Sequence, residues 1–408
     1  MEIKIIDGGV TTPQGFKASG IHCGIRHNKT KNDLALIVSD NLCVSAVCCT
    51  NNKVKAAPVY LTKQNIKEGM SRAILVNSGN ANACTPTGYE DAKDCVSALA
   101  QSLNIKESHV IVNSTGVIGQ TLPKHKIINA IPTLVDGLSK EVLPVATAIM
   151  TTDTFPKTIA ATFYVGGKMA TIGAVAKGSG MIHPNMATML SFLTTDVNIS
   201  HNLLQKSLNT SVNNTYNMIS VDGDTSTNDM VAILASGSLQ NDIIKDENSQ
   251  DYKTFLQALD VINTKLAKDI AKDGEGATKL LTCNVIGASK EEVAREVAKS
   301  IISSNLVKTA MFGEDANWGR IICATGYANI ESELVQDKID VSFFCNDNKI
   351  DVCKNGAGIN FNEELAKAIL SQKEITIEVN LNEGDKKATS YGCDLTYDYV
   401  KINGDYRT

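Results

Sequence analysis

The sequence predicts a mixed fold, α+β or mixed α/β, in which layered sheets are flanked by helices. Short β-branched or apolar runs recur between Gly, Asn and Asp residues, and amphipathic helical patterns lie between them. The chain has 408 residues, which exceeds the size at which a single hydrophobic core keeps growing. We therefore expect either two domains or one large layered unit.

The first half predicts mainly strands, with one clear helix. The strand candidates are residues 34–38, 44–48, 73–76, 110–112, 158–165 and 169–175. Residues 90–103 predict a helix because Ala92, Val96 and Leu99 fall on one face. Residues 77–83 are small and polar, which predicts a loop after a strand.

The second half continues the alternation of strands and helices. Helices are expected at residues 254–272 and 363–370 and from Ser289 onward, and strands at residues 281–286, 340–344, 374–381 and 394–400. Ser289 as N-cap with Glu292 three residues later predicts a capping box. Residues 241–251 form the most polar, loop-like stretch.

Charge predicts small soluble ligands as partners, and the lack of targeting or membrane-spanning patterns predicts a cytoplasmic location. With 39 Lys and Arg against 44 Asp and Glu the net charge is −5, and no basic run suits nucleic acid or a membrane surface. We expect neither a secretory signal nor a membrane span. The 11 cysteines are scattered without a Cys-x-x-Cys pair, and the six histidines are equally dispersed. Reduced cysteines and no metal site are the expectation.

Residues 177–190 contain a threonine in a setting that suits a nucleophile. Thr188 follows the small residue Ala187, Lys177 lies a short loop upstream, and Pro184 interrupts regular structure between them. A threonine hydroxyl needs a base, and the residue's own free α-amine is one known solution. For an internal threonine, this amine exists only after the hydroxyl attacks the preceding carbonyl and water hydrolyses the ester. The freed amine has an ordinary pKa near ~8, so part of it is neutral at physiological pH. The alternative is that the segment simply begins a buried helix or strand.

Two further segments are candidates for a site. Residues 113–119 predict a tight turn after a strand, whose backbone N–H groups and Thr115 hydroxyl could stabilise an oxyanion; an ordinary glycine turn is the alternative. Residues 220–229 open with Asp-x-Asp, but the Gly and Glu positions of a calcium loop are missing. A hydrogen-bonded turn that lines a pocket is the better interpretation there.

Together these segments resemble the ornithine acetyltransferase family, also called glutamate N-acetyltransferase, of arginine biosynthesis. The resemblance runs nearly from end to end, with its motifs in the family's order. The matching segments are residues 15–20, 33–37, 76–84, 114–116, 151–154, 177–190, 221–224, 275–279 and 405–408.

The resemblance implies a precursor that cuts itself between Ala187 and Thr188. It gives an α chain of residues 1–187 and a β chain of residues 188–408, paired as α2β2, with the active site between the α-chain and β-chain portions. Thr188 would take the acetyl group from N2-acetylornithine and pass it to glutamate, without a cofactor. The implied oxyanion donors are Thr115 and Gly116. The implied substrate contacts are Thr154, Lys177, Thr188, Glu275, Asn403 and Thr408.

Residue types at these positions suit the implied roles. Glu275 can pair with a substrate ammonium and Lys177 with a carboxylate. Two positions depart from the family: His183 and Gly404 each stand where Ala is frequent. For His183 a structural role is expected.

Three questions stay open from the sequence. Acetyl-CoA is a possible second acetyl donor, although no motif for it is visible. A self-cleaving amidohydrolase or aminopeptidase would share Thr188 but use water as acceptor, and Glu275 with the chain end argues against it. A non-catalytic binding or scaffold protein would show no cleavage at all.

Overall fold

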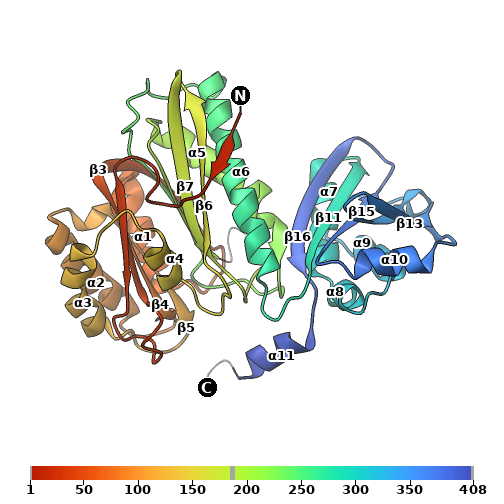
Figure 1. The fold of residues 1–408 in the computed structure, drawn as a ribbon, viewed down its shortest axis with the longest axis horizontal. Helices are drawn as coiled ribbons and strands as arrows, with labels where there is room; N and C mark the ends of the chain where they lie inside the picture. The colour runs from red at the N-terminus through yellow and green to blue at the C-terminus, as the bar shows by residue number, and fades with distance from the viewer. Residues whose placement is uncertain (1, 184–188, 406–408) are drawn as a thin grey trace. The chain divides into compact units, whose positions relative to one another are not determined.

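The computed structural model describes residues 2–183 and 189–405. By its internal contacts the chain forms two compact units (Figure 1). Unit 1 comprises residues 1–178, 184–217 and 224–266, and unit 2 comprises residues 179–183, 218–223 and 267–408. Each unit has a sheet and a hydrophobic core of its own, which confirms a layered mixture of helices and strands.

In the described residues, unit 1 contains a nine-stranded sheet whose two halves share one long strand. Strand β3 (Leu34–Cys49) pairs with β2 and β4 along its first half and with β10 along its second half. Its register with β4 shifts between Val38 and Cys43, so the two strands predicted at 34–38 and 44–48 are one strand with an irregular middle. The order is β1, β6, β7, β8, β10, β3, β4, β5, with β2 beside β3. The other bounds are β1 Lys4–Ile6, β2 Phe16–Ile21, β4 Met70–Asn80, β5 Val110–Val117, β6 Lys157–Val165, β7 Lys168–Lys177, β8 Leu190–Thr195 and β10 Met230–Ala235.

The two faces of β3 belong to two different cores, as strand alternation requires. Leu34, Leu36 and Val38 pack in a cluster with the apolar faces of α2 and α3. Ala35 and Ile37 lie in a second cluster, together with side chains of β8 and β10. The two halves of the sheet therefore stack on each other, and helices cover the outer face of the first half.

Four helices of unit 1, α2, α3, α5 and α6, lie on the outer sides of the sheet, whereas α4 packs in the cluster that contains Ala35 and Ile37. In Figure 1, α2 and α3 flank β3 and β4, whereas α5 and α6 lie on the side of β6 and β7. Phe255 of α6 contacts Phe163 of β6, with ring centroids 6.4 Å apart. The bounds are α1 Ala57–Asn65, α2 Gly88–Leu103, α3 Lys124–Asp136, α4 Leu143–Ala148, α5 His201–Asn214 and α6 Gln250–Lys272.

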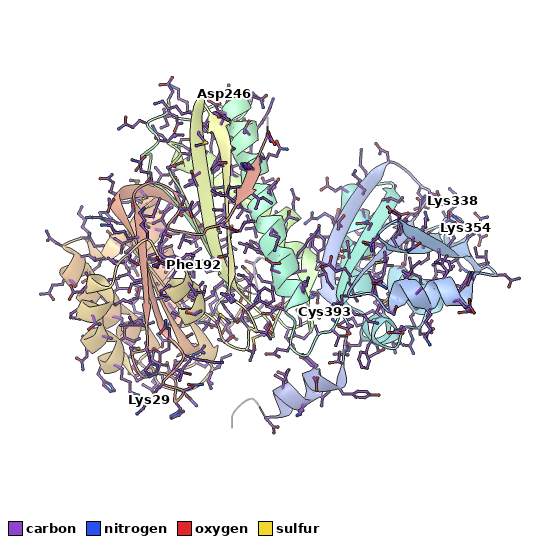
Figure 2. All side chains as sticks on the ribbon, in the orientation of Figure 1. Lys29, Phe192, Asp246, Lys338, Lys354 and Cys393 are labelled. Carbon is purple, nitrogen blue, oxygen red and sulfur yellow. The ribbon has the colours of Figure 1, made fainter. Side chains whose placement is uncertain are left out.

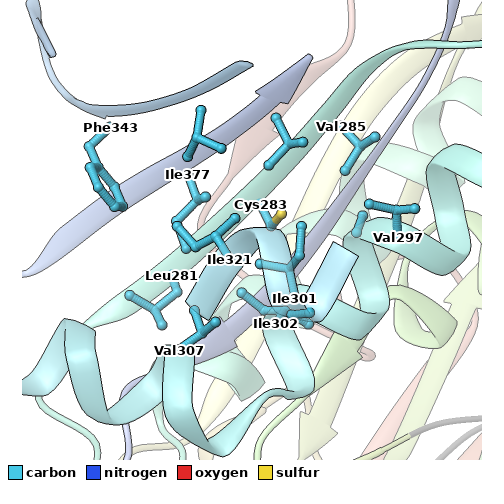
Figure 3. Close-up of a cluster of buried hydrophobic side chains, with 14 of the residues drawn as sticks. Leu281, Cys283, Val285, Val297, Ile301, Ile302, Val307, Ile321, Phe343 and Ile377 are labelled. Atoms are coloured by element: carbon cyan, nitrogen blue, oxygen red, sulfur yellow. The ribbon is translucent and has the colours of Figure 1, made fainter. Parts of the chain in front are cut away.

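Unit 2 contains a seven-stranded sheet covered by helices, in the part of the chain that the structure describes. The strand order is β14, β13, β12, β15, β11, β16, β9. Figure 3 shows its core, in which Val285 and Ile377 of the sheet meet Val297 and Ile301 of α7. The strand bounds are β9 Ile219–Ser220, β11 Leu280–Ala288, β12 Asp340–Cys345, β13 Asn348–Lys354, β14 Ala357–Gly358, β15 Glu374–Asn380 and β16 Lys386–Cys393. The helix bounds are α7 Glu291–Ser303, α8 Asn305–Phe312, α9 Trp318–Gly326, α10 Glu363–Leu370 and α11 Tyr397–Gly404.

The predicted helices are confirmed, but the predicted capping box is wrong. The helix expected from Ser289 begins at Glu291, with Lys290 as N-cap and no side-chain capping hydrogen bond. Lys290 is extended, at φ −136° and ψ 150°, so the Ser289 hydroxyl lies one residue too early to cap the helix. The apolar stripe of the helix alone identified it.

Side chains divide between core and surface as expected for a folded chain (Figure 2). Phe192 of β8 and Cys393 of β16 are buried, whereas Lys29, Asp246 and Lys338 are exposed. All 11 cysteines are free thiols. Among the described residues, no helix combines the length and the apolar character needed to cross a membrane.

Candidate functional site

The paired ends of β4 and β5 bring two backbones unusually close together. Ser78 stands opposite Thr115 and Gly79 opposite Gly116 in the parallel ladder. Gly116 has a φ of 134°, and a Cβ there would lie 2.3 Å from the backbone carbon of Gly79. Only glycine fits that position. The turn predicted at 113–119 and the loop predicted from residue 77 are therefore wrong for residues 113–117 and 77–80, which lie within strands.

The polar side chains at these strand ends form hydrogen bonds within the protein. Ser114 Oγ donates to Asn77 Oδ1 over 2.6 Å, and Asn113 Nδ2 donates to the Asn228 carbonyl over 2.8 Å. In return, Asn228 Nδ2 donates to the carbonyls of Ala81 and Ser114, at 2.7 and 2.8 Å. A buried polar network of this kind fixes backbone position when its members are satisfied. It ties the strand that carries Thr115 and Gly116 to the segment that leads into β10.

Sequence reasoning did not single out Asn228. It lay in the 220–229 stretch that was expected to line a pocket, and it directly precedes the buried run of β10. Its position just before a buried strand was the available signal.

The end of β7 is organised by a buried carboxylate. Asp153 Oδ1 accepts hydrogen bonds from Lys157 Nζ over 2.8 Å and from the Gly178 amide over 2.7 Å. Both side chains of the Asp153–Lys157 ion pair are 0% exposed. Burial raises the pKa of Asp153, but the charges of Lys177 and Lys157 outweigh burial and hold that pKa at about 2. The carboxylate therefore stays ionised and fixes the backbone that follows Lys177.

The predicted cleavage position lies next to β8. Ala187 and Thr188 themselves lie outside the described residues. Met189, the next residue along the chain, is buried, and its carbonyl accepts a hydrogen bond from the Met230 amide over 3.0 Å. Leu190 then begins β8, between β7 and β10. The chain that follows Thr188 is thus built into the sheet of unit 1.

In unit 2, the structure brings Glu275 and Asn403 together. Asn403 Nδ2 donates to Glu275 Oε2 over 2.7 Å. The Glu275 amide donates to the Ser179 carbonyl over 3.2 Å, and the side chain packs against Gly180, where a Cβ would lie 2.2 Å from the Glu275 carboxyl carbon. Glu275 is 7% exposed. A carboxylate held in this way is suited to receive a cationic group.

The strand predicted at residues 394–400 is wrong. Strand β16 ends at Cys393, and residues 397–404 form helix α11, which carries Asn403. The Asp394 carboxylate, directly after the strand, accepts hydrogen bonds from the amides of Thr278 and Lys279, at 2.8 and 2.9 Å.

The acidic loop after β9 binds backbone amides through Asp222. Asp222 accepts hydrogen bonds from the amides of Met181 and Ile182, at 2.6 and 2.8 Å. The hydrogen-bonded turn expected at residues 220–229 is not tested by these contacts, which run to a segment about 40 residues earlier in the sequence. Among the described residues, no group of three or more His, Cys, Asp or Glu side chains is arranged to hold a metal.

His183 also has structural contacts in unit 2. Its Nδ1 lies 3.1 Å from Ser220 Oγ. Burial, and secondarily the positive charge of Lys299, lowers the pKa of His183 to about 4. The imidazole is therefore neutral across the physiological range.

The remaining site predictions divide between the units. Thr115, Gly116, Thr154 and Lys177 belong to unit 1, and Glu275 and Asn403 belong to unit 2. Thr115 is half-buried, Thr154 is exposed and Lys177 is buried. Thr408 lies outside the described residues.

Comparison with known proteins identifies close relatives over the whole chain. Residues 17–408 match the model of the ArgJ family. The chain is 52% identical to the arginine biosynthesis bifunctional protein ArgJ 1 of Clostridium acetobutylicum, over 100% of this chain and 99% of the relative. It is 51% identical to the arginine biosynthesis bifunctional protein ArgJ of Caldanaerobacter subterraneus subsp. tengcongensis, over 100% of both chains. The crystal structure of the arginine biosynthesis bifunctional protein argJ from Bacillus halodurans shares 48% identity with a TM-score of 0.50, and covers 53% of this chain and 99% of that chain.

Proposed function

Since the chain belongs to the ArgJ family, we propose that it transfers an acetyl group from N2-acetylornithine to glutamate by way of Thr188. It is an acyltransferase of arginine biosynthesis that acts on small-molecule substrates. The products are ornithine and N-acetylglutamate. The reaction uses no metal or prosthetic group, because the threonine hydroxyl itself carries the acetyl group. Acetyl-CoA is a second donor within this proposal, in keeping with the word bifunctional in the names of the relatives.

The nucleophile is produced by cleavage of the precursor. The Thr188 hydroxyl attacks the Ala187 carbonyl, the C–N bond breaks, and the nitrogen gains a proton as an ester forms. Water then hydrolyses this ester, which leaves a carboxylate on Ala187 and a free α-amine on Thr188. The α chain of residues 1–187 and the β chain of residues 188–408 result. In support, the matched Bacillus halodurans chain covers 53% of this sequence, and residues 188–408 make up a similar share, a little over half.

Acetyl transfer then proceeds in two half-reactions. The Thr188 α-amine takes the hydroxyl proton while the oxygen attacks the acetyl carbonyl of acetylornithine. Ornithine leaves with that proton, and the amine of glutamate later attacks the acetyl ester in the same way. Thr115 and Gly116 stabilise the negative oxygen of each intermediate. Transfer instead of hydrolysis requires that water be excluded until glutamate arrives.

Charged side chains recognise the amino-acid parts of the substrates. Lys177 binds a carboxylate, and Glu275 binds an ammonium group. Asn403 holds the Glu275 carboxylate in place through the 2.7 Å hydrogen bond in unit 2. Thr154 and Thr408 complete the substrate contacts. We also propose an α2β2 assembly and a cytoplasmic location, where these metabolites are at hand.

The strongest support for the proposal is a hydrogen-bonded connection between the strand of Thr115 and Gly116 and the start of β8. Asn228 bonds the strand that holds Thr115 and Gly116, and it lies two residues before Met230, which bonds the residue after Thr188. The oxyanion backbone and the start of β8 therefore belong to one hydrogen-bonded assembly in unit 1. An acyltransferase with a nucleophile at Thr188 needs this connection.

Cleavage and transfer are tested together with Thr188→Ala and Thr188→Ser. The wild-type protein is expected to give two bands on a denaturing gel and to form N-acetylglutamate from acetylornithine and glutamate. Thr188→Ala is expected to give one band and no product, because no hydroxyl is left. Thr188→Ser, the matched control, keeps the hydroxyl and is expected to retain cleavage and part of the activity. An uncut wild-type chain, or full transfer by Thr188→Ala, would contradict the proposal.

The acceptor distinguishes transfer from hydrolysis. With acetylornithine alone, an amidohydrolase or aminopeptidase releases acetate continuously, whereas the proposed enzyme stops after one acetyl group per site. Addition of glutamate should restart turnover and yield acetylglutamate. Replacement of acetylornithine by acetyl-CoA in the same assay determines whether acetyl-CoA is a donor.

A further inference from the structure

Arg26 lies in the connection between β2 and β3, and the resemblance assigns it no role. Its backbone is fixed by Asp33, a fully buried residue. The Asp33 carboxylate accepts hydrogen bonds from the amides of Cys23 and Arg26, at 2.6 and 2.9 Å. The Asp33 carbonyl accepts another from the Ser78 amide over 2.9 Å. The connection is therefore attached to the last part of β4.

The side chain of Arg26 lies against Gly79, near the end of β4. A Cβ at Gly79 would lie 2.9 Å from Arg26 Cγ and 3.2 Å from Ile25 Cγ2, so these two side chains occupy the space beside this glycine. The backbone of Gly79 in turn contacts Gly116, where a Cβ would lie 2.3 Å from the Gly79 carbonyl carbon. Closely packed groups pass a displacement to their neighbours. A change at Arg26 therefore reaches the backbone of Gly116 through one residue.

The guanidinium group at the other end of this side chain is anchored. Its Nη2 atom donates a hydrogen bond to the Met150 carbonyl. The amide of the next residue, Thr151, donates to Asp153 Oδ2 over 2.9 Å, so the anchoring segment is itself fixed. Hydrogen bonds from a charged donor are stronger than those between neutral groups. Arg26 is therefore held at its backbone, along its stem and at its charged end.

We propose that Arg26 is a positioning residue for the oxyanion backbone at Gly116. It acts through Gly79, against which its anchored side chain packs, and not by contact with a substrate. The inference rests on the proposed function, in which Thr115 and Gly116 stabilise the negative oxygen of each intermediate. The same donors serve both half-reactions. Loss of the Arg26 anchor therefore slows formation and removal of the acetyl-enzyme by similar factors.

Single-turnover kinetics of Arg26→Met measure the two half-reactions separately. Met keeps an apolar stem beside Gly79 but cannot donate to the Met150 carbonyl. Formation of the acetyl-enzyme is followed by rapid quench with acetylornithine alone, and its removal after glutamate is added. Both rate constants are expected to fall about tenfold or more, because small misplacements of catalytic groups are costly. The substrate concentrations that give half-maximal rates should stay the same, since ground-state binding is untouched.

Arg72→Met is the matched control. Arg72 lies in the first part of β4, far along the strand from Gly79, and its Nε donates to the Ser39 carbonyl over 3.1 Å. This variant therefore also loses a hydrogen bond from a guanidinium group to a carbonyl. Both variants are expected to lose similar stability in urea, but only Arg26→Met should slow the two half-reactions. A merely structural defect would act on the rates of both variants alike.

Arg26→Lys keeps the inference testable where Arg26→Met does not fold. Lysine retains a charged donor but not the planar fork of arginine, so both half-reactions should slow equally, by about threefold, whereas Arg72→Lys should not slow. Single-turnover rate constants do not depend on the fraction of chains that are cut. Arg26 variants with wild-type rates, a loss in only one half-reaction, or an equal loss in the Arg72 variants would overturn the inference. A wild-type chain that neither cuts nor transfers contradicts the proposed function instead.

Discussion

At the scale of single residues, the position of Glu275 depends on the missing side chain of residue 180. The carboxylate of Glu275 fills the space that a Cβ at Gly180 would occupy, and Asn403 holds it from the other side. The resemblance to a family singled out Glu275 and Asn403 as candidate substrate contacts. Their mutual hydrogen bond could not be predicted, because residues 128 apart in sequence meet only through the fold.

Gly180→Ala is expected to weaken substrate binding more than it lowers turnover. The added methyl group displaces the flexible end of Glu275, which should raise KM for acetylornithine roughly tenfold, the equivalent of about 1.4 kcal/mol. Stability should change little, because the contact is with a movable side chain. Steady-state kinetics of the variant and of Gly326→Ala, a glycine with open space around it, provide the comparison. Equal KM values for the two variants would refute this explanation.

His183 should make the protein less stable in mild acid. Its pKa in the folded state is about 4 against an ordinary value of 6.5, so the unfolded chain binds the proton more readily. The folded state therefore loses stability as pH falls below about 6.5, and the loss levels off below about 4. His183→Ala should reduce this loss, whereas replacement of the exposed His125 should not. Urea unfolding at pH 7 and pH 4.5 measures the difference, and identical pH dependence in all three proteins would disprove it.

At the scale of elements, apolar periodicity predicted eight of the 16 strands and four of the 11 α-helices of the described residues, and polar contacts explain three of the errors. Helix α10 has the predicted bounds, Glu363–Leu370, because its apolar face is regular. The ends of β4 and β5 were missed because their polar side chains bind one another instead of solvent. Helix α11 was taken for a strand because Leu395, Tyr397 and Tyr399 alternate with polar residues. Asn228 was not predicted as an individual site residue, since its contacts are with strands far away in the sequence.

The buried Asp153–Lys157 ion pair at the start of β6 should contribute strongly to stability. Asp153→Asn leaves Lys157 with its charge buried and its partner removed, so we expect a loss of about 3–5 kcal/mol in the free energy of unfolding. Asp94→Asn, which removes an exposed partner of Lys124, should cost less than about 1 kcal/mol. Because the pKa of Asp153 is lowered to about 2, its stabilising effect is present above about pH 3.8 and is lost as pH falls through 2. Urea titration of both variants measures the free energy of unfolding. A small loss that is equal in both variants would show that the buried ion pair contributes little to stability.

At the scale of the whole molecule, the proposed cleavage position falls within the sequence of unit 1 instead of between the two units. Strand β8 follows the proposed cut in the sequence but lies between β7, which precedes it, and β10. The units of the fold and the chains expected after cleavage are therefore different divisions of the same sequence. The position of the proposed cut comes from the sequence, but only the sheet order shows that strands before and after this position share one sheet.

The two chains should therefore stay together after cleavage. Their separation would expose the buried side chains of β8 and break its hydrogen bonds with both neighbouring strands, which makes dissociation unfavourable. Size-exclusion chromatography in neutral buffer should elute both fragments in one peak, and denaturant should be needed to resolve them. Free fragments without denaturant would contradict this description of the sheet.

The central claim is that Thr188 becomes an N-terminus and then carries acetyl, and the intact mass of the β chain tests it most directly. The protein is mixed with acetylornithine alone, quenched in acid and analysed by mass spectrometry, then again after glutamate is added. We predict a fragment that begins at Thr188 and gains one acetyl group, bound through the Thr188 oxygen, which glutamate removes. An uncut chain, or a β chain whose mass does not change with acetylornithine, would contradict the claim.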